Sequence, residues 1–209
     1  MAAEDPAPDA SDPLAGLPLR ERKRLRAMRR IQTVALDLFD ARGFDQVTIE
    51  DIARRCEVSA SSVYRYFGTK EQLVIWDEYD PAAIEAIVAE LDSYSPYEAV
   101  RRVIGSFVQV AFEQDEDRIR RRLHLAYSTP SIEAASALQG YEMARLIAGI
   151  LAAKLGRDPD DLDVQVFAHA YVGGVLGGMR HWYASGFSTP LPEILDRPLA
   201  ALEGRIDLG

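Results

Sequence analysis

Apolar residues recur at three- and four-residue spacings along almost the whole chain, which is the pattern of amphipathic α-helices. The alternation of apolar and polar residues that indicates strands is nearly absent, and glycine and proline separate the periodic segments. The pattern predicts an all-α fold. The expected helices span 19–42, 48–58 with a tight turn at 56–58, 59–67, 70–91 with a break at Pro81, 96–116, 118–128, 131–155, 160–185 and 192–203.

Three short helices in the first part of the chain have consistent start signals. Thr48 and Asp51 are spaced as a capping box, in which each side chain accepts a hydrogen bond from the other residue's backbone N–H. Thr69 and Gln72 have the same spacing, and Ser59 can cap the helix between these two starts. Two short helices joined by three or four residues form a helix-turn-helix, which we place at 48–67.

The second helix of such a unit enters the major groove of DNA, and its first residues contact the base edges. Here these residues are small and mostly carry hydroxyl groups: Ser59, Ala60, Ser61 and Ser62. Hydroxyls can donate to or accept from several base edges, so they read sequence without one strong preference. Longer polar side chains follow: Tyr64, Arg65, Tyr66 and Lys70. Tyrosine hydroxyls and lysine ammonium groups suit phosphate oxygens, which fix the position of the protein on DNA.

The net charge of −9 is unevenly distributed along the chain. Residues 19–70 carry 12 basic and 7 acidic side chains, whereas the segments on both sides are acidic. Affinity for nucleic acid depends on local positive charge, so this block is compatible with DNA binding. We therefore expect a disordered acidic tail at 1–18, a helix-turn-helix domain at 19–68 and a larger domain at 69–209.

Composition excludes several other classes of protein. A hydrophobic content of 48% is too high for a wholly disordered chain. The chain contains no run of eighteen uncharged apolar residues, so no transmembrane helix is expected. The acidic N-terminus does not resemble a signal peptide. The single cysteine, Cys56, cannot form an internal disulfide and fits a reducing compartment. We expect a cytoplasmic protein.

The residues from 48 to 73 carry a clear family resemblance. Thr48-Ile49-x-x-Ile52-Ala53, followed by Val58-Ser59-x-x-x-Val63-Tyr64-x-Tyr66-Phe67-x-x-Lys70-Glu71-x-Leu73, resembles the TetR family of transcriptional regulators. The resemblance implies a homodimer that binds a pseudo-palindromic DNA operator and is released by a small molecule bound in the C-terminal domain. It implies phosphate contacts by Thr48, Tyr64, Tyr66 and Lys70, and base contacts by Ala60, Ser61, Ser62 and Tyr64.

Two positions depart from the family pattern. Glu57 stands in the turn where the family usually has glycine, and a positive φ at this residue would strain the backbone by about 1 kcal/mol or more. Ser61-Ser62 replaces the usual Gly-Thr pair of the recognition helix. The base preference of other family members therefore does not transfer to this chain.

The second half of the chain resembles a TetR subgroup associated with acyl-CoA-like ligands, which includes the mycofactocin-system regulators. The matching pieces are Arg121-Arg122-Leu123, Ser128-Thr129-Pro130, 155–159 and Arg180-His181-Trp182. Such a ligand needs an apolar tunnel and a basic mouth. Candidates for the tunnel are Phe107, Phe112, Tyr127, Met143, Ile147, Phe167, Tyr171, Met179 and Trp182. Candidates for the mouth are Arg102, Arg121, Arg122 and Arg180. Ordinary core packing is the alternative for each aromatic residue.

Four glycines, Gly173, Gly174, Gly177 and Gly178, lie inside the helix expected at 160–185. Glycine in mid-helix costs about 1 kcal/mol relative to alanine, so four of them need a reason. The reason is either close helix approach across a dimer interface or room for a ligand. The family resemblance places the last two helices in a four-helix dimer interface, which favours the first explanation.

No pattern of catalytic or metal-binding residues is present. The histidines His124, His169 and His181 have no usual zinc spacing, and no nucleophile elbow, phosphate-binding loop or dinucleotide fingerprint occurs. We expect no catalysis, no metal and no cofactor. Two alternatives to a ligand-responsive repressor stay open. One is a DNA-binding regulator whose C-terminal half only dimerises, and the other is a small-molecule carrier with a vestigial helix-turn-helix. A cavity of several hundred Å³ would favour the ligand-responsive protein, and a filled core would favour the dimerisation module.

Overall fold

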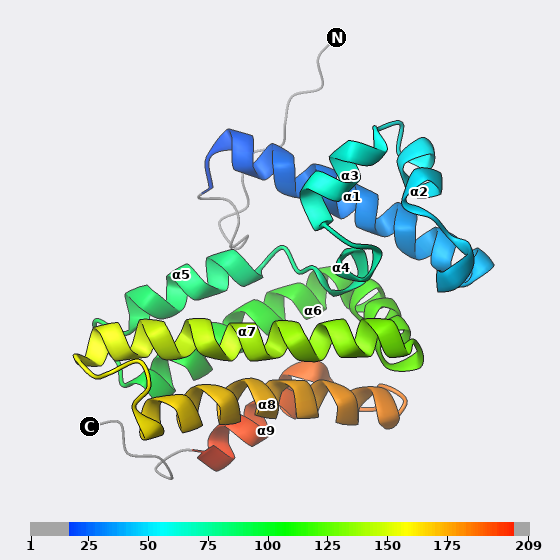
Figure 1. Ribbon diagram of the computed structural model, residues 1–209. Helices are drawn as coiled ribbons and strands as arrows, with labels where there is room; N and C mark the ends of the chain where they lie inside the picture. The colour runs from blue at the N-terminus through cyan, green and yellow to red at the C-terminus, as the bar shows by residue number, and fades with distance from the viewer. Residues whose placement is uncertain (1–16, 203–209) are drawn as a thin grey trace.

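The structure is a computed structural model that describes residues 17–202, so most of the expected acidic tail (1–16) lies outside the described residues. In the described part the prediction of an all-α fold is confirmed. The elements are α1 (Leu19–Arg42), η1 (Phe44–Gln46), α2 (Ile49–Arg55), α3 (Ala60–Phe67), α4 (Lys70–Ile75), α5 (Asp80–Glu90), α6 (Pro96–Ser128), α7 (Pro130–Leu155), α8 (Leu162–Ala184) and α9 (Leu191–Leu202). Helices α1–α3 lie on one side of the molecule and α5–α9 on the other, with α4 between them (Figure 1).

The predicted start signals act as helix caps. Thr48 and Asp51 form the complete capping box of α2, and these hydrogen bonds hold the pKa of the Asp51 carboxyl below its usual range. Ser59 Oγ accepts a hydrogen bond from the Ser62 N–H at 3.1 Å at the start of α3. Thr69 Oγ1 accepts from the Gln72 N–H at 3.2 Å at the start of α4. The boundaries of the helix-turn-helix therefore follow from contacts within single turns of the chain.

Two helix interruptions differ from their predicted positions. The break expected at Pro81 lies between α4 and α5, and Pro81 itself belongs to the first turn of α5, where a missing N–H breaks no intrahelical bond. The separate helices expected at 96–116 and 118–128 form one helix, α6. Its interruption is a single residue, Asp115, with φ −153° and ψ 31°.

The core around α1–α4 continues into the C-terminal half. Its fully buried side chains include Met28, Leu36 and Phe39 of α1, together with Ile52 and Leu73. The same cluster also contains Leu125 and Ala126 of α6 and Ile132 of α7. Helices α7 and α8 run side by side as an antiparallel pair, and α9 packs on α8 and α6 (Figure 1). Within residues 17–202 no helix is both long enough and apolar enough to cross a membrane.

The turn between α2 and α3 has the strained residue that the sequence predicted. Glu57 has φ 56°, in the left-handed region that favours glycine. The Val58 N–H donates to the Ala53 carbonyl at 3.0 Å and the Glu57 N–H donates to the Arg54 carbonyl at 3.2 Å, which is the bond pattern of a Schellman motif. The motif keeps α2 and α3 at their mutual angle in spite of the strain at Glu57.

Replacing Glu57 by glycine removes this strain. We expect Glu57→Gly to raise the free energy of unfolding by about 0.5–1 kcal/mol, because the left-handed cost of a Cβ exceeds the extra entropy of an unfolded glycine. Urea unfolding measures the change. Glu57→Ala is the matched control, since it keeps the Cβ and loses only an exposed carboxylate. An equal gain from both substitutions would show that charge, and not backbone strain, is responsible.

Candidate functional site

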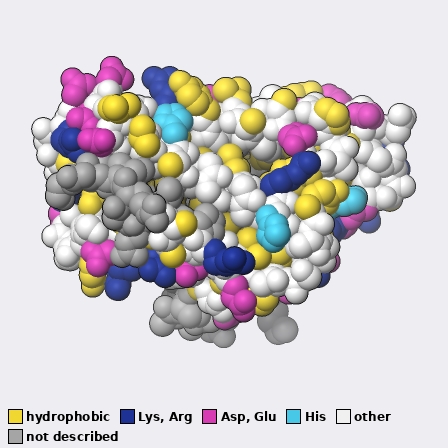
Figure 2. Space-filling view, turned by 90° about the horizontal axis from the view of Figure 1, so that it is seen from below, with side chains coloured by type: hydrophobic (Ala, Val, Ile, Leu, Met, Phe, Trp, Pro, Cys, Tyr) yellow, Lys and Arg dark blue, Asp and Glu magenta, His cyan; other side chains and the backbone are white. Residues whose placement is uncertain are grey.

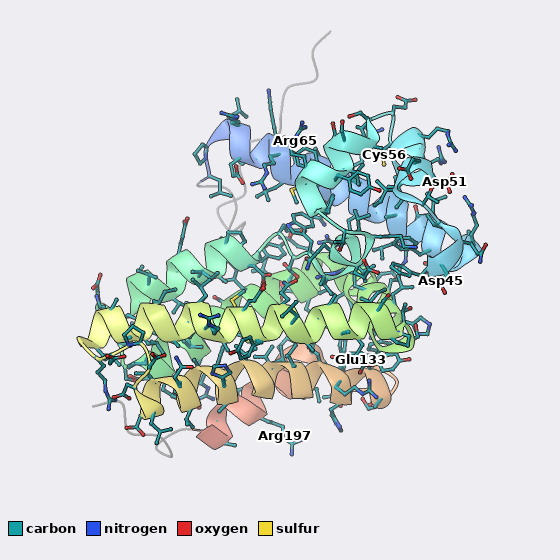
Figure 3. All side chains as sticks on the ribbon, viewed as in Figure 1. Asp45, Asp51, Cys56, Arg65, Glu133 and Arg197 are labelled. Carbon is teal, nitrogen blue, oxygen red and sulfur yellow. The ribbon has the colours of Figure 1, made fainter. Side chains whose placement is uncertain are left out.

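Helix α3 is anchored by its apolar side and presents its polar side to solvent. Val63 and Phe67 are buried beside Ile52 of α2. On the other side of α3, Tyr64 is 48% exposed and Arg65 is also exposed. Figure 3 shows that the α2–α3 unit, with Asp51 and Arg65 labelled, lies at the end of the molecule away from Arg197 of α9. The described part of the chain therefore leaves one side of a short helix open to a duplex.

The hydroxyl groups at the start of α3 hydrogen-bond to one another. Ser59 Oγ lies 2.9 Å from Ser61 Oγ and 2.8 Å from Ser62 Oγ. Ser59 and Ser61 are exposed, whereas Ser62 and Ala60 are half-buried. Base contacts by these serines would replace hydrogen bonds that the protein already makes. Each such contact would therefore add less net binding free energy.

Three predicted phosphate contacts also have roles within the protein. The Lys70 ammonium donates to the Phe44 carbonyl at 2.8 Å and to the Val47 carbonyl at 3.1 Å, and it lies 4.1 Å from the centre of the Phe44 ring. Lys70 thus holds the segment that leads into α2, a role that the sequence did not reveal. The Tyr66 ring packs against the N-terminal core and Thr48 caps α2. Their contacts with phosphate stay predictions.

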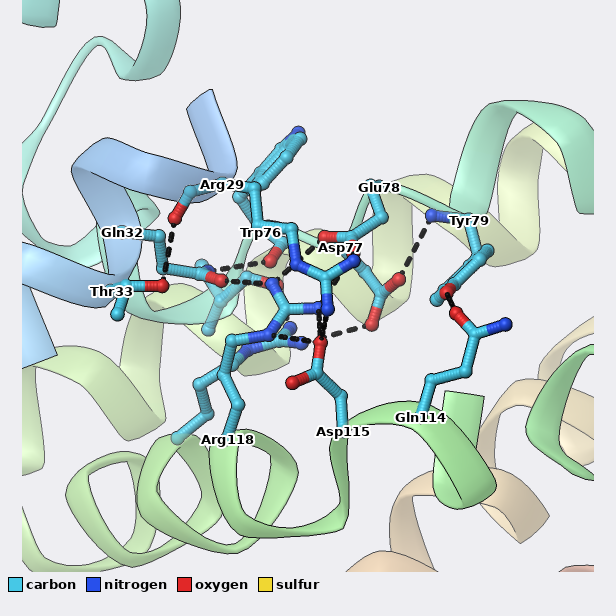
Figure 4. A network of polar contacts seen from close by, with 12 residues as sticks. Arg29, Gln32, Thr33, Trp76, Asp77, Glu78, Tyr79, Gln114, Asp115 and Arg118 are labelled. Atoms are coloured by element: carbon cyan, nitrogen blue, oxygen red, sulfur yellow. Dashed lines mark hydrogen bonds and ion pairs between the residues drawn. The ribbon is translucent and has the colours of Figure 1, made fainter. Parts of the chain in front are cut away.

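A buried polar network joins α1, the α4–α5 linker and α6 (Figure 4). Arg118 of α6 donates two hydrogen bonds to the Glu78 carboxylate, at 2.6 and 2.8 Å, and both side chains are almost fully buried. The same guanidinium donates to Gln32 Oε1 of α1 at 2.6 Å. Gln32 Nε2 donates to the carbonyls of Leu73 and Trp76, each at 2.9 Å. The network therefore ties the end of α4 to both halves of the molecule.

A second arginine balances the charge of this network. Arg29 of α1 forms ion pairs with Glu78, at 3.3 Å, and with Asp115. Asp115 is the non-helical residue of α6, and its carboxylate also accepts from Arg118 Nε at 3.0 Å. Two guanidinium groups thus face two carboxylates. The sequence contained one signal of this site. Gln32 is a polar residue among the buried apolar residues of α1, which include Met28 and Leu36.

Arg121 and Arg122 follow on α6 and already have partners within the chain, so their place at the mouth of a tunnel stays a prediction. Arg122 donates to the carbonyls of Val74 and Ile75, each at 2.8 Å, and pairs with Asp77 at 2.9 Å. It therefore satisfies carbonyls at the C-terminal end of α4. Arg121 bridges α6 to two carboxylates of α1, Asp37 and Asp40. Both side chains connect the domains and leave few donors for a ligand.

The two other arginines proposed for the mouth also have partners in the chain. Arg102 pairs with Glu90 at 3.0 Å and stacks over Tyr94. Arg180 pairs with Glu133 at 3.0 Å and lies over the ring of Tyr127. These arginines are spread over α6 and α8 and do not converge.

Two carboxyl groups beside Arg122 have shifted pKa values of opposite sign. Burial opposes ionisation of Asp77, but Arg122 and the hydrogen bond from the Tyr79 N–H outweigh it and lower the pKa. At Asp80, burial together with the neighbouring charge of Asp77 raises the pKa to about 7. The linker before α5 therefore holds a carboxylate that stays charged, Asp77, and the first residue of α5, Asp80, holds one that titrates near neutral pH.

The predicted tunnel residues do not line one space. Ile147, Phe167 and Tyr171 are buried in a cluster between α5, α6, α7 and α8, with Phe107 and Met143 packed against it. Trp182 belongs to a different cluster with α9, where Phe112 and Met179 also pack. Tyr127 contacts Tyr183, with ring centres 5.3 Å apart. The described structure packs these side chains in two cores, and their contact with a ligand stays a prediction.

Two small hollows lie between helices in the described part of the C-terminal half. A hollow of about 20 Å³ lies between α6 and α9 and is lined by Arg101, Ile104, Gly105, Val108, Pro192, Leu195 and Asp196. A second hollow, of about 10 Å³, lies between α5 and α7 and is lined by Ile84, Ile87, Ile147, Ile150 and Leu151. Each is about the size of one water molecule. Both hollows are far smaller than the cavity of several hundred Å³ that the sequence analysis set as the criterion for a ligand-responsive protein.

The glycines of α8 divide between two sides of the helix. Gly173 and Gly177 are exposed, and a Cβ at either position would meet nothing within 4 Å. Gly178 is buried, and a Cβ there would lie 2.8 Å from Leu195 Cδ2 of α9. The close approach at Gly178 is thus to α9 of the same chain, and a place for Gly178 in a dimer interface stays a prediction. Gly174 is half-buried between these two sides.

The fold and the α2–α3 surface define the class of the protein, a helix-turn-helix transcriptional regulator with a second helical region. Residues 31–75 match the family "Bacterial regulatory proteins, tetR family", and residues 94–207 match the "MftR C-terminal domain" family. The second match covers more than half of the chain. The chain belongs to the TetR family, in the group with an MftR-type C-terminal domain.

Named relatives agree with this assignment. The chain is 27% identical over 165 residues to the mycofactocin biosynthesis transcriptional regulator MftR of Mycobacterium tuberculosis, covering 77% of this chain and 82% of that protein. It is 28% identical over 194 residues to the HTH-type transcriptional regulator TcmR of Streptomyces glaucescens, covering 87% and 84%. A solved structure of Thermus thermophilus FadR, a TetR-family repressor in complex with lauroyl-CoA, matches with a TM-score of 0.53 at 21% identity, covering 86% of this chain and 95% of that one. At that identity the likeness shows the shared fold.

The buried network gives a stability prediction. We expect Arg118→Met to lower the free energy of unfolding by about 3–5 kcal/mol, because Glu78 would remain buried with only part of its charge compensated. Arg121→Met is the control, since its partners Asp37 and Asp40 are largely exposed, and it should cost about 1 kcal/mol or less. Urea unfolding at one fixed protein concentration compares them. Equal losses for the two variants would contradict the assignment of Arg118 as the central cation.

Proposed function

We propose that this protein is a homodimeric regulator that binds a pseudo-palindromic operator through α3 and is released from it by a small, mainly apolar molecule. The observation that carries the DNA-binding part is the orientation of α3. Its apolar side is buried by Val63 and Phe67, while Ser61, Tyr64 and Arg65 face solvent. A helix anchored on one side and polar on the other suits the major groove. We propose the helix-turn-helix domain at 19–68 and the effector and dimerisation domain at 69–209.

The contacts with DNA follow from the exposure of each side chain. Ser59, Ser61 and Tyr64 are exposed at the first two turns of α3, so we assign them to base edges and to the adjacent backbone. Arg65, the residue after Tyr64, is also exposed, and its guanidinium group can bind a DNA phosphate. Ala60 and Ser62 are half-buried, and their small side chains allow α3 to approach the DNA closely. Thr48, Tyr66 and Lys70 would reach phosphates only from the rim, because each has a role within the domain.

An exposed apolar stripe on α7 and α8 supports the homodimer. Leu162 of α8 is 75% exposed, and Leu138 and Tyr141 of α7 are 59% and 55% exposed. Gly173 and Gly177 continue the stripe along α8 with open space above them, so a second helix pair can approach closely. Seen from the side of α8 and α9, hydrophobic side chains instead alternate with charged ones (Figure 2). We place the interface on the outer side of α7 and α8.

Dimerisation is also required by the proposed DNA reading. The two half-sites of an operator are separated by about one helical turn, which one copy of a short recognition helix cannot span. A two-fold axis through the α7–α8 stripe gives two copies of α3 at a fixed separation. A monomer would lose the second half-site and most of its specific affinity.

The effector is supported by the family membership and by the structure of Thermus thermophilus FadR, which is a complex with lauroyl-CoA. An elongated apolar ligand is compatible with the largely apolar interior of α5–α8. Because the hollows hold only about one water each, ligand entry requires these helices to separate. The resemblance to the TetR family favours a repressor over an activator.

The small size of these hollows favours a second candidate function. A regulator whose C-terminal half only dimerises needs no internal cavity, and the described interior fits that role. The two candidates differ in one property, because only the first is released from DNA by a small molecule. Both candidates share the same DNA-binding surface and the same dimer interface.

Salt dependence tests the DNA-binding surface. We expect the protein to bind DNA from upstream of its own gene, and Arg65→Gln to reduce the slope of log affinity against log salt by about 0.9, the contribution of one phosphate contact. Tyr64→Ala should weaken binding by about tenfold. Arg197→Gln is the control, since Arg197 is exposed on α9 at the far end of the molecule (Figure 3). A slope unchanged by Arg65→Gln would exclude that phosphate contact.

A glycine substitution tests the dimer interface. We expect Gly177→Leu to raise the dimer dissociation constant at least about tenfold, because a leucine side chain keeps the facing helix away. Gly105→Leu is the matched control, since Gly105 also lies in mid-helix with open space around it, but on α6. Both changes improve helix propensity, so neither should unfold the monomer. Sedimentation velocity distinguishes them, and a Gly177→Leu protein that dimerises like the wild type would move the interface elsewhere.

A further inference from the structure

The hydroxyl of Tyr171 is the least explained polar group in the C-terminal half. Tyr171 is 5% exposed in the middle of α8, and its hydroxyl is fully buried with no hydrogen-bond partner among the described residues. Leaving a buried hydroxyl unpaired costs about 1–3 kcal/mol. Burial raises the pKa of Tyr171, so the group stays protonated and acts as a hydrogen-bond donor. An unsatisfied donor in an otherwise packed core calls for a partner from outside the chain.

The side chains that cluster with Tyr171 are apolar. Its cluster contains Ile87 of α5, Val103 of α6, Ile147 of α7 and Phe167 of α8, whose ring is nearly parallel to that of Tyr171. None of the side chains in this cluster carries a charge. An uncharged partner suits this cluster, because an unpaired carboxylate among apolar side chains would lose several kcal/mol of hydration.

One side of α7 continues this cluster in both directions. Ser136, Gln139, Met143 and Ile147 follow one another at three- and four-residue spacings, so they share one side of the helix. Met143 and Ile147 pack with Tyr171, while Ser136 Oγ and Gln139 Oε1 are two further buried polar atoms without a partner. The residues from 136 to 147 extend for about 16 Å along the helix axis. One end of this side is apolar and the other end has unused hydrogen-bonding groups.

The apolar end borders a small hollow. The hollow between α5 and α7 is lined by Ile147 of the same side and by Ile84 and Ile87 of α5. Helix α5 follows the linker that holds Glu78, the buried partner of Arg118. A molecule that entered beside Ile147 would displace α5 and pull on the connection to the DNA-binding half. The site thus lies where binding can be transmitted to α4.

We propose that Tyr171 donates a hydrogen bond to the uncharged carbonyl group of an elongated, mainly apolar ligand bound between α5, α6, α7 and α8. The carbonyl belongs to an ester, thioester, amide or ketone. The hydrocarbon part lies toward Ile147 and Ile84, and the more polar end lies toward Gln139 and Ser136. This inference rests on the effector-responsive form of the proposed function and adds the residue that selects the ligand class. It gives Tyr171 a specificity-determining role that its neighbour Phe167 cannot supply.

The test compares a ketone with an anion of similar length on the full chain. Calorimetry measures the binding of 2-undecanone and of decanoate to the wild type, to Tyr171→Phe and to Tyr183→Phe. We expect the wild type to bind 2-undecanone at least about tenfold more tightly than decanoate. Tyr171→Phe should weaken ketone binding about fivefold to tenfold, which is the value of one neutral hydrogen bond. Tyr183→Phe, on the same helix but outside the cluster, should leave it unchanged.

The melting temperature of the ligand-free proteins separates a ligand contact from a structural one. Tyr171→Phe should melt at the same or a higher temperature than the wild type, because no hydrogen bond within the protein is lost. A lower melting temperature would show that the hydroxyl is satisfied internally and would overturn the proposal. So would failure of the wild type to bind 2-undecanone, equal binding of both probes, or equal weakening by Tyr183→Phe. DNA binding is measured separately without probe, so its loss would refute the proposed function while leaving the ligand result in place.

Discussion

The buried ion pair between Arg118 and Glu78 is the constraint on which the arrangement of the two halves depends. Glu78 lies in the short linker after α4, and Arg118 lies one turn beyond the irregular residue of α6. Removing two charges from water is expensive, so the pair is stable only with good geometry and additional hydrogen bonds. Gln32, Arg29 and Asp115 supply these bonds from α1 and α6. Any shift of α4 relative to α6 breaks several charged contacts together, which favours two discrete states over a continuous drift.

This constraint explains why the DNA-binding half behaves as an extension of the C-terminal core. Arg122 holds the end of α4, Arg121 holds α1, and both belong to the same two turns of α6 as Arg118. The apolar cluster of α1–α4 also includes Leu125, Ala126 and Ile132 of the other half. Packed side chains and ion pairs therefore connect α6 to the helices that carry α3. The recognition helix itself needs only local caps and two buried anchors, so it can be moved as a unit.

The interior of α5–α8 combines dense packing with unused polar atoms. Most buried polar groups in proteins are hydrogen-bonded, so three buried atoms without partners in one helix pair, on Ser136, Gln139 and Tyr171, are a concentration that needs a cause. Dense packing alone fits a dimerisation module, and the unpaired hydroxyl fits a receptor in its empty state. A receptor that is closed without ligand must spend part of its binding energy on opening, which lowers affinity and couples occupancy to a change of shape.

The amino-acid sequence alone determined what depends on residues within one or two turns of each other. The all-α fold, the caps at Thr48 and Ser59, and the strained turn at Glu57 follow from spacing and backbone geometry. Only the tertiary structure decided the partners of long side chains, since these lie far apart in the chain. Arg118 meets Glu78 across 40 residues and Gln32 across 86. For the same reason Arg122 became a cap for α4, Lys70 turned toward η1, and Gly178 packed on α9, because a side chain of a given type binds whichever element the fold places beside it.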